Sequence, residues 1–221
     1  MLLLYGIPVA ALPSTEKLKS YLGDAWTAVW RERHPGCTAE DAMRRSLGGL
    51  CLLRIALPGA RLAYTSAGRP YLPDGEAECS ITHTEDWIFC AVCVSKDGTC
   101  PSRVGVDAEN GQRLSSSRLE ALSSRWFSPQ EQRLFLEDPS SFTFLRIWTR
   151  KEALVKWTGQ GMAGLRSSDT TRAEKDLALA YAEYTVEGTL VSLCYPPSLS
   201  APATPTLLHS WEQLTALKQP S

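Results

Sequence analysis

The sequence predicts a mixed α+β (α/β) fold made of two lobes. Stretches with helical periodicity alternate with short strand-like runs, and this pattern begins again after a turn-rich segment at residues 96–103. No sequence repeat is visible. The 221 residues, 43% of them hydrophobic and 21% charged, are typical of a globular protein that buries about 70% of its unfolded surface. Two lobes of helices on small sheets are therefore expected.

The first half begins with an apolar segment at residues 1–17. It lacks a basic start and is interrupted by glycine and proline, which favours a buried strand over a signal peptide. Two helices are predicted next, over 14–34 and over 38–54, the second with Thr38 as its N-cap. Strand-like pieces follow, at 61–66, 78–84 and 86–94.

The second half repeats this order. Ser128, Pro129 and Glu131 form the signature of a capping box with a proline in the first turn. Alternating residues around a Glu-Gly turn predict a final pair of strands, and the tail after them is turn-rich. The predicted elements are a strand at 103–108, helices at 115–126 and about 140–158, and strands within 177–196.

Composition excludes several classes of protein. The net charge of −1 indicates neither nucleic-acid nor membrane-surface binding, and no segment is apolar enough to span a bilayer. The seven cysteines lie mostly in apolar runs, which suggests a reducing, cytoplasmic location. Cys90 and Cys93 have CxxC spacing, but three residues along a strand place them on opposite faces, so a zinc site is not expected.

Two acids end a β-branched run at residues 104–109, VGVDAE. Alternation places Asp107 and Glu109 on one face of the strand, where their mutual repulsion is about 2–3 kcal/mol at an effective dielectric of ~20. An exposed pair screened by water is one interpretation. A divalent cation held by oxygen ligands is the other, and magnesium suits such ligands.

The predicted helix over 140–158 carries a second acidic position. Glu152 and Lys156 are four residues apart and share a face, which by itself is typical of a solvent-exposed ion pair. Trp148 continues the same stripe and is expected to be partly buried. This neighbour favours a cleft rather than open water beside Glu152 and Lys156.

These motifs together resemble the surfactin-type (Sfp-like) 4′-phosphopantetheinyl transferases. The similarity covers roughly residues 38–165, and the flanks match only in general character. The motifs, in chain order, are EDAMRRSLGG (40–49), GRPY (68–71), SITHTED (80–86), VGVDAE (104–109), FSPQE (127–131) and WTRKEALVK (148–156).

The resemblance implies a pseudo-dimer of two similar lobes with coenzyme A in the cleft between them. Residues 1–102 would form the N-terminal lobe on the 3′-phosphate and adenine side, and 103–221 the C-terminal lobe with the metal and catalytic residues. Such enzymes transfer the phosphopantetheine group of coenzyme A to a serine of an apo acyl or peptidyl carrier protein and release 3′,5′-ADP. A cytoplasmic monomer that binds neither nucleic acid nor membrane is expected.

By the same resemblance, Asp107 and Glu109 hold Mg²⁺, with Mn²⁺ as a possible substitute. Glu152 would be the third metal ligand or the general base, and Lys156 the cation over the pyrophosphate. Asp107, Glu152 and Lys156 would thus form the catalytic set. The residues implied to contact coenzyme A are Arg44, Arg69, Thr82, His83, Lys151 and Lys156.

The chain departs from the family pattern at three of these positions. Thr82 stands where serine is common and keeps the hydroxyl, and Arg69 stands where lysine is usual and keeps the charge. Ala108 replaces a larger aliphatic residue between the two acids. Glu131 matches the pattern, but its capping box already explains it, so it is either a helper of the active site or only a cap.

Two other functions compete with transfer. A non-catalytic module that binds coenzyme A or a carrier protein would need no reactive site, and a magnesium-dependent hydrolase of nucleotide pyrophosphates would use the same acids with water. The carrier itself, from fatty-acid, polyketide or nonribosomal-peptide biosynthesis, is not identified by the sequence.

Overall fold

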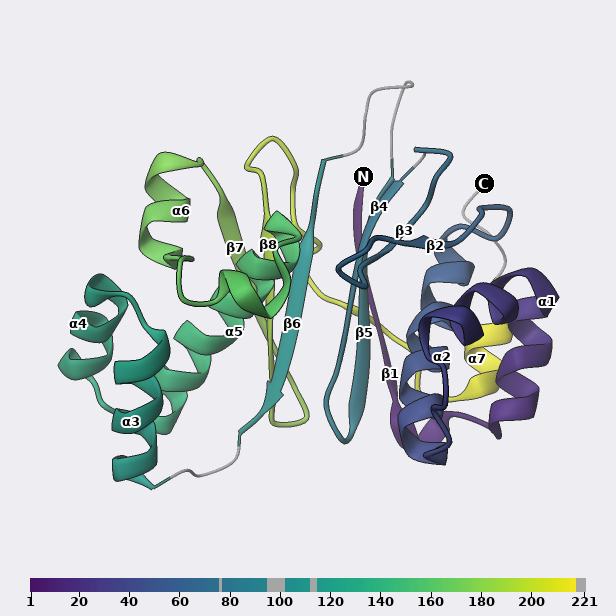
Figure 1. Ribbon diagram of the computed structural model, residues 1–221, viewed down its shortest axis with the longest axis horizontal. Helices are drawn as coiled ribbons and strands as arrows, with labels where there is room; N and C mark the ends of the chain where they lie inside the picture. The colour runs from purple at the N-terminus through teal and green to yellow at the C-terminus, as the bar shows by residue number, and fades with distance from the viewer. Residues whose placement is uncertain (76, 95–101, 112–114, 218–221) are drawn as a thin grey trace.

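The protein has the mixed α/β architecture that the sequence predicts, in a computed structural model that describes residues 1–75, 77–94, 102–111 and 115–217. Two main sheets lie near the centre of the molecule, and helices cover their outer sides (Figure 1). Most of the predicted boundary at 96–103 lies outside the described residues. Among those residues, no helix is both long and apolar enough to cross a bilayer.

The first sheet is built on the N-terminal strand. Its order is β4-β5-β1-β9, with β1 antiparallel to β5 and parallel to β9. Its strands are β1 (Leu2–Pro8), β4 (Ala77–His83), β5 (Trp87–Val94) and β9 (Thr206–Leu207). The helices that accompany this sheet are α1 (Thr15–Arg33), α2 (Glu40–Ala56) and α7 (Trp211–Ala216), with the short 3₁₀ turn η1 (Val9–Ala11). A separate two-stranded sheet is formed by β2 (Ala63–Tyr64) and β3 (Pro70–Tyr71).

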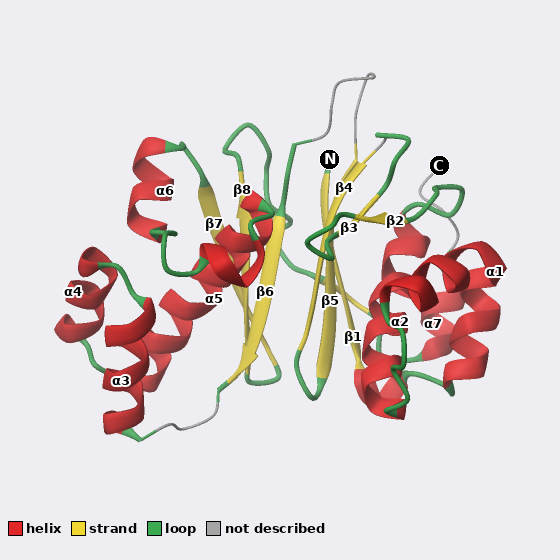
Figure 2. Cartoon of the chain, in the orientation of Figure 1, coloured by secondary structure: helices red, strands yellow, loops and turns green. Residues whose placement is uncertain are grey.

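The second sheet follows in the chain and is antiparallel, in the order β6-β8-β7 (Figure 2). Its strands are β6 (Gly105–Asn110), β7 (Ala180–Val186) and β8 (Thr189–Tyr195). Its helical elements are α3 (Ser116–Trp126), α4 (Pro129–Glu137), α5 (Ser141–Thr158), η2 (Gly161–Gly164) and α6 (Thr170–Asp176).

An apolar core joins the two sheets. Phe89 of β5, Val106 of β6 and Val191 of β8 are fully buried in it. Because side chains alternate along a strand, Cys93 points into this core while Cys90 points into the core beneath α1 and α2. The prediction that the CxxC pair faces opposite sides is confirmed.

Three local features differ from the sequence prediction. Helix α2 begins at Glu40 with Ala39 as its N-cap, and no side chain caps it there. The Glu40 carboxylate instead accepts hydrogen bonds from the backbone and hydroxyl of Thr15, which ties the start of α2 to the start of α1. Gly23 has a φ of 74° and kinks α1. The predicted capping box of Ser128 and Glu131 is confirmed.

The turn-rich tail holds the third difference, because it contains β9 and α7. Strand β9 pairs with β1, and Trp211 and Leu214 of α7 are buried in the core beneath α1 and α2. The end of the chain therefore packs on the first sheet. The division into lobes 1–102 and 103–221 stays a prediction, and a division by packing would assign residues 206–216 to the first unit.

Strand β6 and helix α5 approach each other closely at Gly105. A Cβ at this position would lie 2.0 Å from the carbonyl oxygen of Ala153 and 2.7 Å from the backbone nitrogen of Trp157. No side chain larger than hydrogen fits there. The contact places Glu152 and Lys156, the residues that precede Ala153 and Trp157, over β6.

We expect Gly105→Ala to destabilise the protein by about 3 kcal/mol or more, because a methyl group against rigid backbone forces β6 and α5 apart. Urea unfolding measures the loss. Gly59→Ala is the matched control, since a Cβ there would meet nothing within 4 Å, and it should change stability by less than about 0.5 kcal/mol. Equal stabilities for the two variants would contradict this packing.

Candidate active site

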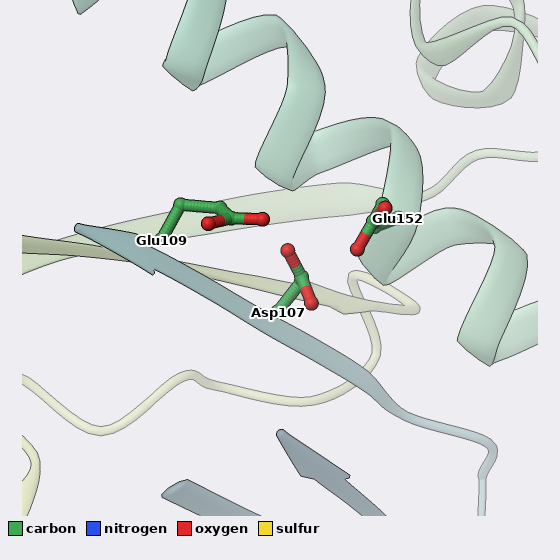
Figure 3. A group of neighbouring side chains, drawn as sticks. All are labelled: Asp107, Glu109 and Glu152. Atoms are coloured by element: carbon green, nitrogen blue, oxygen red, sulfur yellow. The ribbon is translucent and has the colours of Figure 1, made fainter. Parts of the chain in front are cut away.

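Three carboxylates converge where β6 meets α5 (Figure 3). Asp107 and Glu109 project from one face of β6, as strand alternation requires, and Glu152 projects toward them from α5. One oxygen atom from each of the three lies within 4.8 Å of the others. The structure therefore brings together the three residues predicted to hold a metal.

Asp107 is the buried member of this cluster, with only 3% of its surface exposed. Its Oδ1 accepts hydrogen bonds from the Thr82 hydroxyl at 3.1 Å and from Lys156 Nζ at 2.8 Å. Its Oδ2 is buried and has no hydrogen-bond partner among the residues that the structure describes. A buried oxygen without a donor is unfavourable, and a bound cation would satisfy it.

The crowding of negative charge shifts the two glutamates. Burial, followed by the charge of Asp107, raises the pKa of Glu152 to about 8. The same two causes raise the pKa of Glu109. Each raised pKa means that the ionised form of that glutamate is unfavourable in the site when no cation is bound. Three oxygen donors with such shifts fit Mg²⁺ or Mn²⁺.

Lys156 joins α5 to this cluster through Asp107. The spacing of four residues allows an ion pair with Glu152, but the ammonium group pairs with Asp107, which is 49 residues away. Its side chain is 32% exposed. Lys156 thus remains able to meet a ligand while it holds the carboxylate of Asp107 in place.

Two cavities flank the acids. One, of about 290 Å³, is lined by residues that include Arg69, Ser80, Glu152 and Lys156. The other, of about 370 Å³, is lined by Arg45, His83, Thr84, Glu85, Glu109, Asn110 and Leu145. A ligand that enters either cavity reaches the carboxylates.

Of the predicted coenzyme A contacts on β4 and the preceding loop, Arg69 and His83 each line one of these cavities, and Thr82 lies beside Asp107. Thr82 bonds Asp107, and His83 follows it at the end of β4, where burial and then Arg45 lower its pKa. Arg69 lines the first cavity, although its guanidinium also pairs with Glu78 at 2.6 Å. Thr82 and His83 therefore lie beside the acid cluster, and Arg69 lies at the wall of the cavity that Glu152 also lines.

Lys151 and Arg44 are not brought to the acids. The Lys151 side chain is fully buried, 2.8 Å from Glu131, and also donates to the carbonyl of Ser168. Successive residues of a helix point about 100° apart, so Lys151 faces the core while Glu152 faces the site. Arg44 donates to backbone carbonyls near the start of the chain.

Glu131 is a buried structural junction as well as a cap. Its carboxylate accepts hydrogen bonds from Ser128 N, Lys151 Nζ, and the backbone and hydroxyl of Thr170. These contacts join α4, α5 and the start of α6. Glu131 therefore does more than cap α4, because it also binds Lys151 and Thr170.

Sequence reasoning assigned no role to Ser80. The Ser80 hydroxyl accepts a hydrogen bond from Val106 N at 3.0 Å and so fixes β6 against β4. The available signal for Ser80 was its position two residues before Thr82, on the same face of β4.

Comparisons with known proteins agree with this site. A family model described as the 4′-phosphopantetheinyl transferase superfamily matches residues 103–190, which include all three acids. Over 137 residues, the chain is 33% identical to the 4′-phosphopantetheinyl transferase HetI of Nostoc sp., a match that covers 55% of this chain and 54% of that protein. Over 148 residues, it is 26% identical to the 4′-phosphopantetheinyl transferase Sfp of Bacillus subtilis, a match that covers 62% of this chain and 61% of that protein.

A third relative, the 4′-phosphopantetheinyl transferase psf-1 of Bacillus pumilus, is 28% identical over 147 residues, covering 62% of this chain and 58% of that protein. The chain thus spans between about half and three fifths of the length of these curated relatives. Residues 103–190 therefore match the 4′-phosphopantetheinyl transferase superfamily, and the chain is similar to Sfp-like members of it, in agreement with the motifs.

Replacing Lys151 with methionine should destabilise the fold by about 3–5 kcal/mol, because it leaves the buried Glu131 carboxylate without its cation. Urea unfolding measures this. Lys175→Met, at an exposed position on α6, is the matched control and should change stability by less than about 0.5 kcal/mol. Wild-type stability of Lys151→Met would contradict the buried pair.

The stability of the metal-free protein should fall as the pH rises from about 4.5 to about 8. In that window the folded state keeps a proton on Glu152 that the unfolded chain has lost, so folding becomes less favourable. Glu152→Gln should flatten the fall, measured as the difference in Tm between about pH 5 and about pH 8 in a chelator. Parallel Tm curves for the two proteins would contradict the raised pKa.

Proposed function

We propose that this chain transfers the 4′-phosphopantetheine group of coenzyme A to a serine of an apo acyl or peptidyl carrier protein and releases 3′,5′-ADP. The observation that carries the proposal is the cluster of Asp107, Glu109 and Glu152 beside Lys156 and between two cavities. These residues occupy the motif positions of a superfamily whose members are named for this reaction.

Asp107, Glu109 and Glu152 would hold the magnesium ion, with manganese as a possible substitute. The unpartnered Oδ2 of Asp107 and the raised pKa values of both glutamates support this assignment. When bound, the cation would offset the charge of the carboxylates and of the diphosphate.

The cations of the chain would position the diphosphate. Lys156 lies beside Asp107 and lines the first cavity, so its ammonium can contact a phosphate oxygen there. Thr82 keeps Asp107 oriented, and His83 lies near the same acids. Arg69, at the wall of the first cavity, is a further candidate contact. Charge-assisted hydrogen bonds from such groups are about twice as strong as neutral ones.

The bond changes are a single displacement at phosphorus. The serine Oγ of the carrier forms a bond to the phosphorus that carries the pantetheine arm, and the bond from that phosphorus to the bridging oxygen breaks. The leaving group keeps the bridging oxygen and departs as 3′,5′-ADP. The serine proton goes to a base, and in-line positioning with charge stabilisation supplies most of the acceleration.

Glu152 has two candidate roles, metal ligand and general base. Its position within 4.8 Å of the other two carboxylates supports the first. Its pKa of about 8 in the metal-free site supports the second, because a base is most effective when its pKa lies near the working pH.

A non-catalytic binding module is not favoured, because the three acids and Lys156 are all present and assembled. The hydrolase alternative would yield free phosphopantetheine in place of a modified carrier, so product analysis separates the two. Coenzyme A and a carrier protein are therefore the proposed partners, and a cytoplasmic monomer remains the prediction.

Asp107→Asn should lower the transfer rate by about 100-fold or more, because the neutral amide weakens both the metal site and the contact with Lys156. Intact-protein mass spectrometry of an apo acyl carrier protein, with coenzyme A and Mg²⁺, measures the added phosphopantetheinyl mass. Asp24→Asn, at an exposed position on α1, is the matched control and should behave as wild type.

Omitting Mg²⁺ from the same reaction should also abolish the mass gain of the carrier. A wild-type rate from Asp107→Asn at saturating Mg²⁺ would contradict the metal assignment. Failure of the wild-type protein to modify acyl and peptidyl carriers of several kinds would contradict the proposed function itself.

A further inference from the structure

Strands β4 and β6 are edge strands of the two sheets, and they contact each other along a line that we call the seam. Among the residues that the structure describes, three side-chain hydrogen bonds connect β4 and the turn after it to β6. Two of them involve Ser80 and Thr82 and lie at or beside Asp107. The third lies further along both strands, where Asn110 meets Asp86. The far end of the seam therefore depends on Asn110.

Asn110 is the last residue of β6, and its side chain binds both parts of the chain. Its Nδ2 donates to Asp86 Oδ2 at 2.8 Å, and its Oδ1 accepts a hydrogen bond from the Thr189 hydroxyl at 2.9 Å. Because an ionised carboxylate only accepts hydrogen bonds, Asp86 fixes which end of the amide faces each partner. An aspartate at this position would instead set two negative charges against each other.

Both partners of Asn110 are themselves held in place. The backbone nitrogen of Asp86 donates to the Thr84 hydroxyl at 3.1 Å, and its carbonyl oxygen accepts a hydrogen bond from Val9 N at 2.7 Å. Thr189, on β8, is only 1% exposed. The Asn110 side chain thus spans two fixed points, so it sets the distance between the turn after β4 and the end of β6.

The 370 Å³ cavity lies across this end of the seam. His83, on the first sheet, and Glu109, on the second, both line it, and so does Asn110. Strand alternation directs Glu109 to the acid cluster and Asn110 to the opposite face of β6. The width of the cavity between His83 and Glu109 therefore depends on how firmly the end of β6 is bound to the turn.

We propose that Asn110 is a positioning residue, whose bond to Asp86 sets the width of this cavity and thereby the affinity for coenzyme A. This rests on the proposed function, which brings coenzyme A to the acids and to His83. A ligand that touches both sheets loses affinity when the sheets are free to separate. A metal ion alone should not, because the three acids all belong to β6 and α5.

The contact has its own spectroscopic signal, because Asn110 is the one asparagine in the sequence. In protein labelled with ¹⁵N at the asparagine side-chain amide, a two-dimensional NMR spectrum shows one NH₂ pair. Asp86→Ala should shift this pair and speed its exchange with water, since the amide loses its charged acceptor. Asp24→Ala, at an exposed position on α1, is the matched control and should leave the pair unchanged.

Ligand binding tests what the contact does. Isothermal titration calorimetry with Mg²⁺ present measures the Kd of coenzyme A, and electron paramagnetic resonance of free Mn²⁺ measures metal affinity without coenzyme A. Asn110→Ala and Asp86→Ala should each weaken coenzyme A by about fivefold or more and Mn²⁺ by less than about twofold. The double variant should bind coenzyme A no more weakly than Asn110→Ala, because both changes remove one contact.

An exchanged pair, Asp86→Asn with Asn110→Asp, rebuilds the contact with donor and acceptor reversed. It should recover most of the coenzyme A affinity that Asn110→Ala loses, whereas Asn110→Asp alone should not, because it opposes two carboxylates. In the carrier-transfer assay, Asn110→Ala should raise the KM for coenzyme A and change kcat by less than about twofold. Its Tm should fall by less than about 4 °C, because the contact with Asp86 is exposed.

An unmoved NH₂ pair in Asp86→Ala, additive losses in the double variant, or an exchanged pair as weak as Asn110→Asp would overturn the inference. So would equal losses of coenzyme A and Mn²⁺ affinity, which a general loosening of the fold would produce. Coenzyme A affinity that depends on the contact, without transfer to any carrier, would leave the inference standing and reject the proposed function. A wild-type protein that does not bind coenzyme A would overturn both.

Discussion

The carboxylate of Asp107, buried where the two sheets meet, is the constraint on which the site depends. One of its oxygens receives donors from both sides, Thr82 on the first sheet and Lys156 on α5, whereas the other has no partner in the described part of the chain. A second carboxylate within 4.8 Å costs about 3.5 kcal/mol or more at an effective dielectric of ~20. Lys156 offsets only part of this repulsion, which is why a cation at this site is proposed.

The periodicities of strand and helix predicted which side chains share a face. Alternation placed Asp107 with Glu109, and the helical repeat placed Glu152 one turn from Lys156, as the structure has them. The same patterns do not reveal what lies opposite a face. Lys156 binds Asp107 rather than Glu152, because the approach of β6 to α5 is a tertiary contact between residues 49 positions apart.

Adjacent charged residues show that the sequence pattern also does not reveal which of two neighbours faces the site. Lys151 and Glu152 are neighbours, as are Arg44 and Arg45, and a family motif does not distinguish which member of a pair reaches the ligand. A turn of about 100° per residue sends Lys151 to Glu131 and Arg44 to the carbonyls of η1. The tail was equally beyond prediction, since the two residues of β9 are too few to show a period.

Glycines explain how helices from both parts of the chain reach one site. Gly105 lets the backbone of α5 rest on β6 at a distance that no other residue would permit, and Gly49 lets α2 pack closely on the Ile81 side chain of β4. The backbone contact at Gly105 shortens the path from helix axis to strand, so Glu152 and Lys156 need little reach. Their positions are then set by the packed backbone rather than by flexible side chains, which is the preorganisation that charge stabilisation in phosphoryl transfer requires.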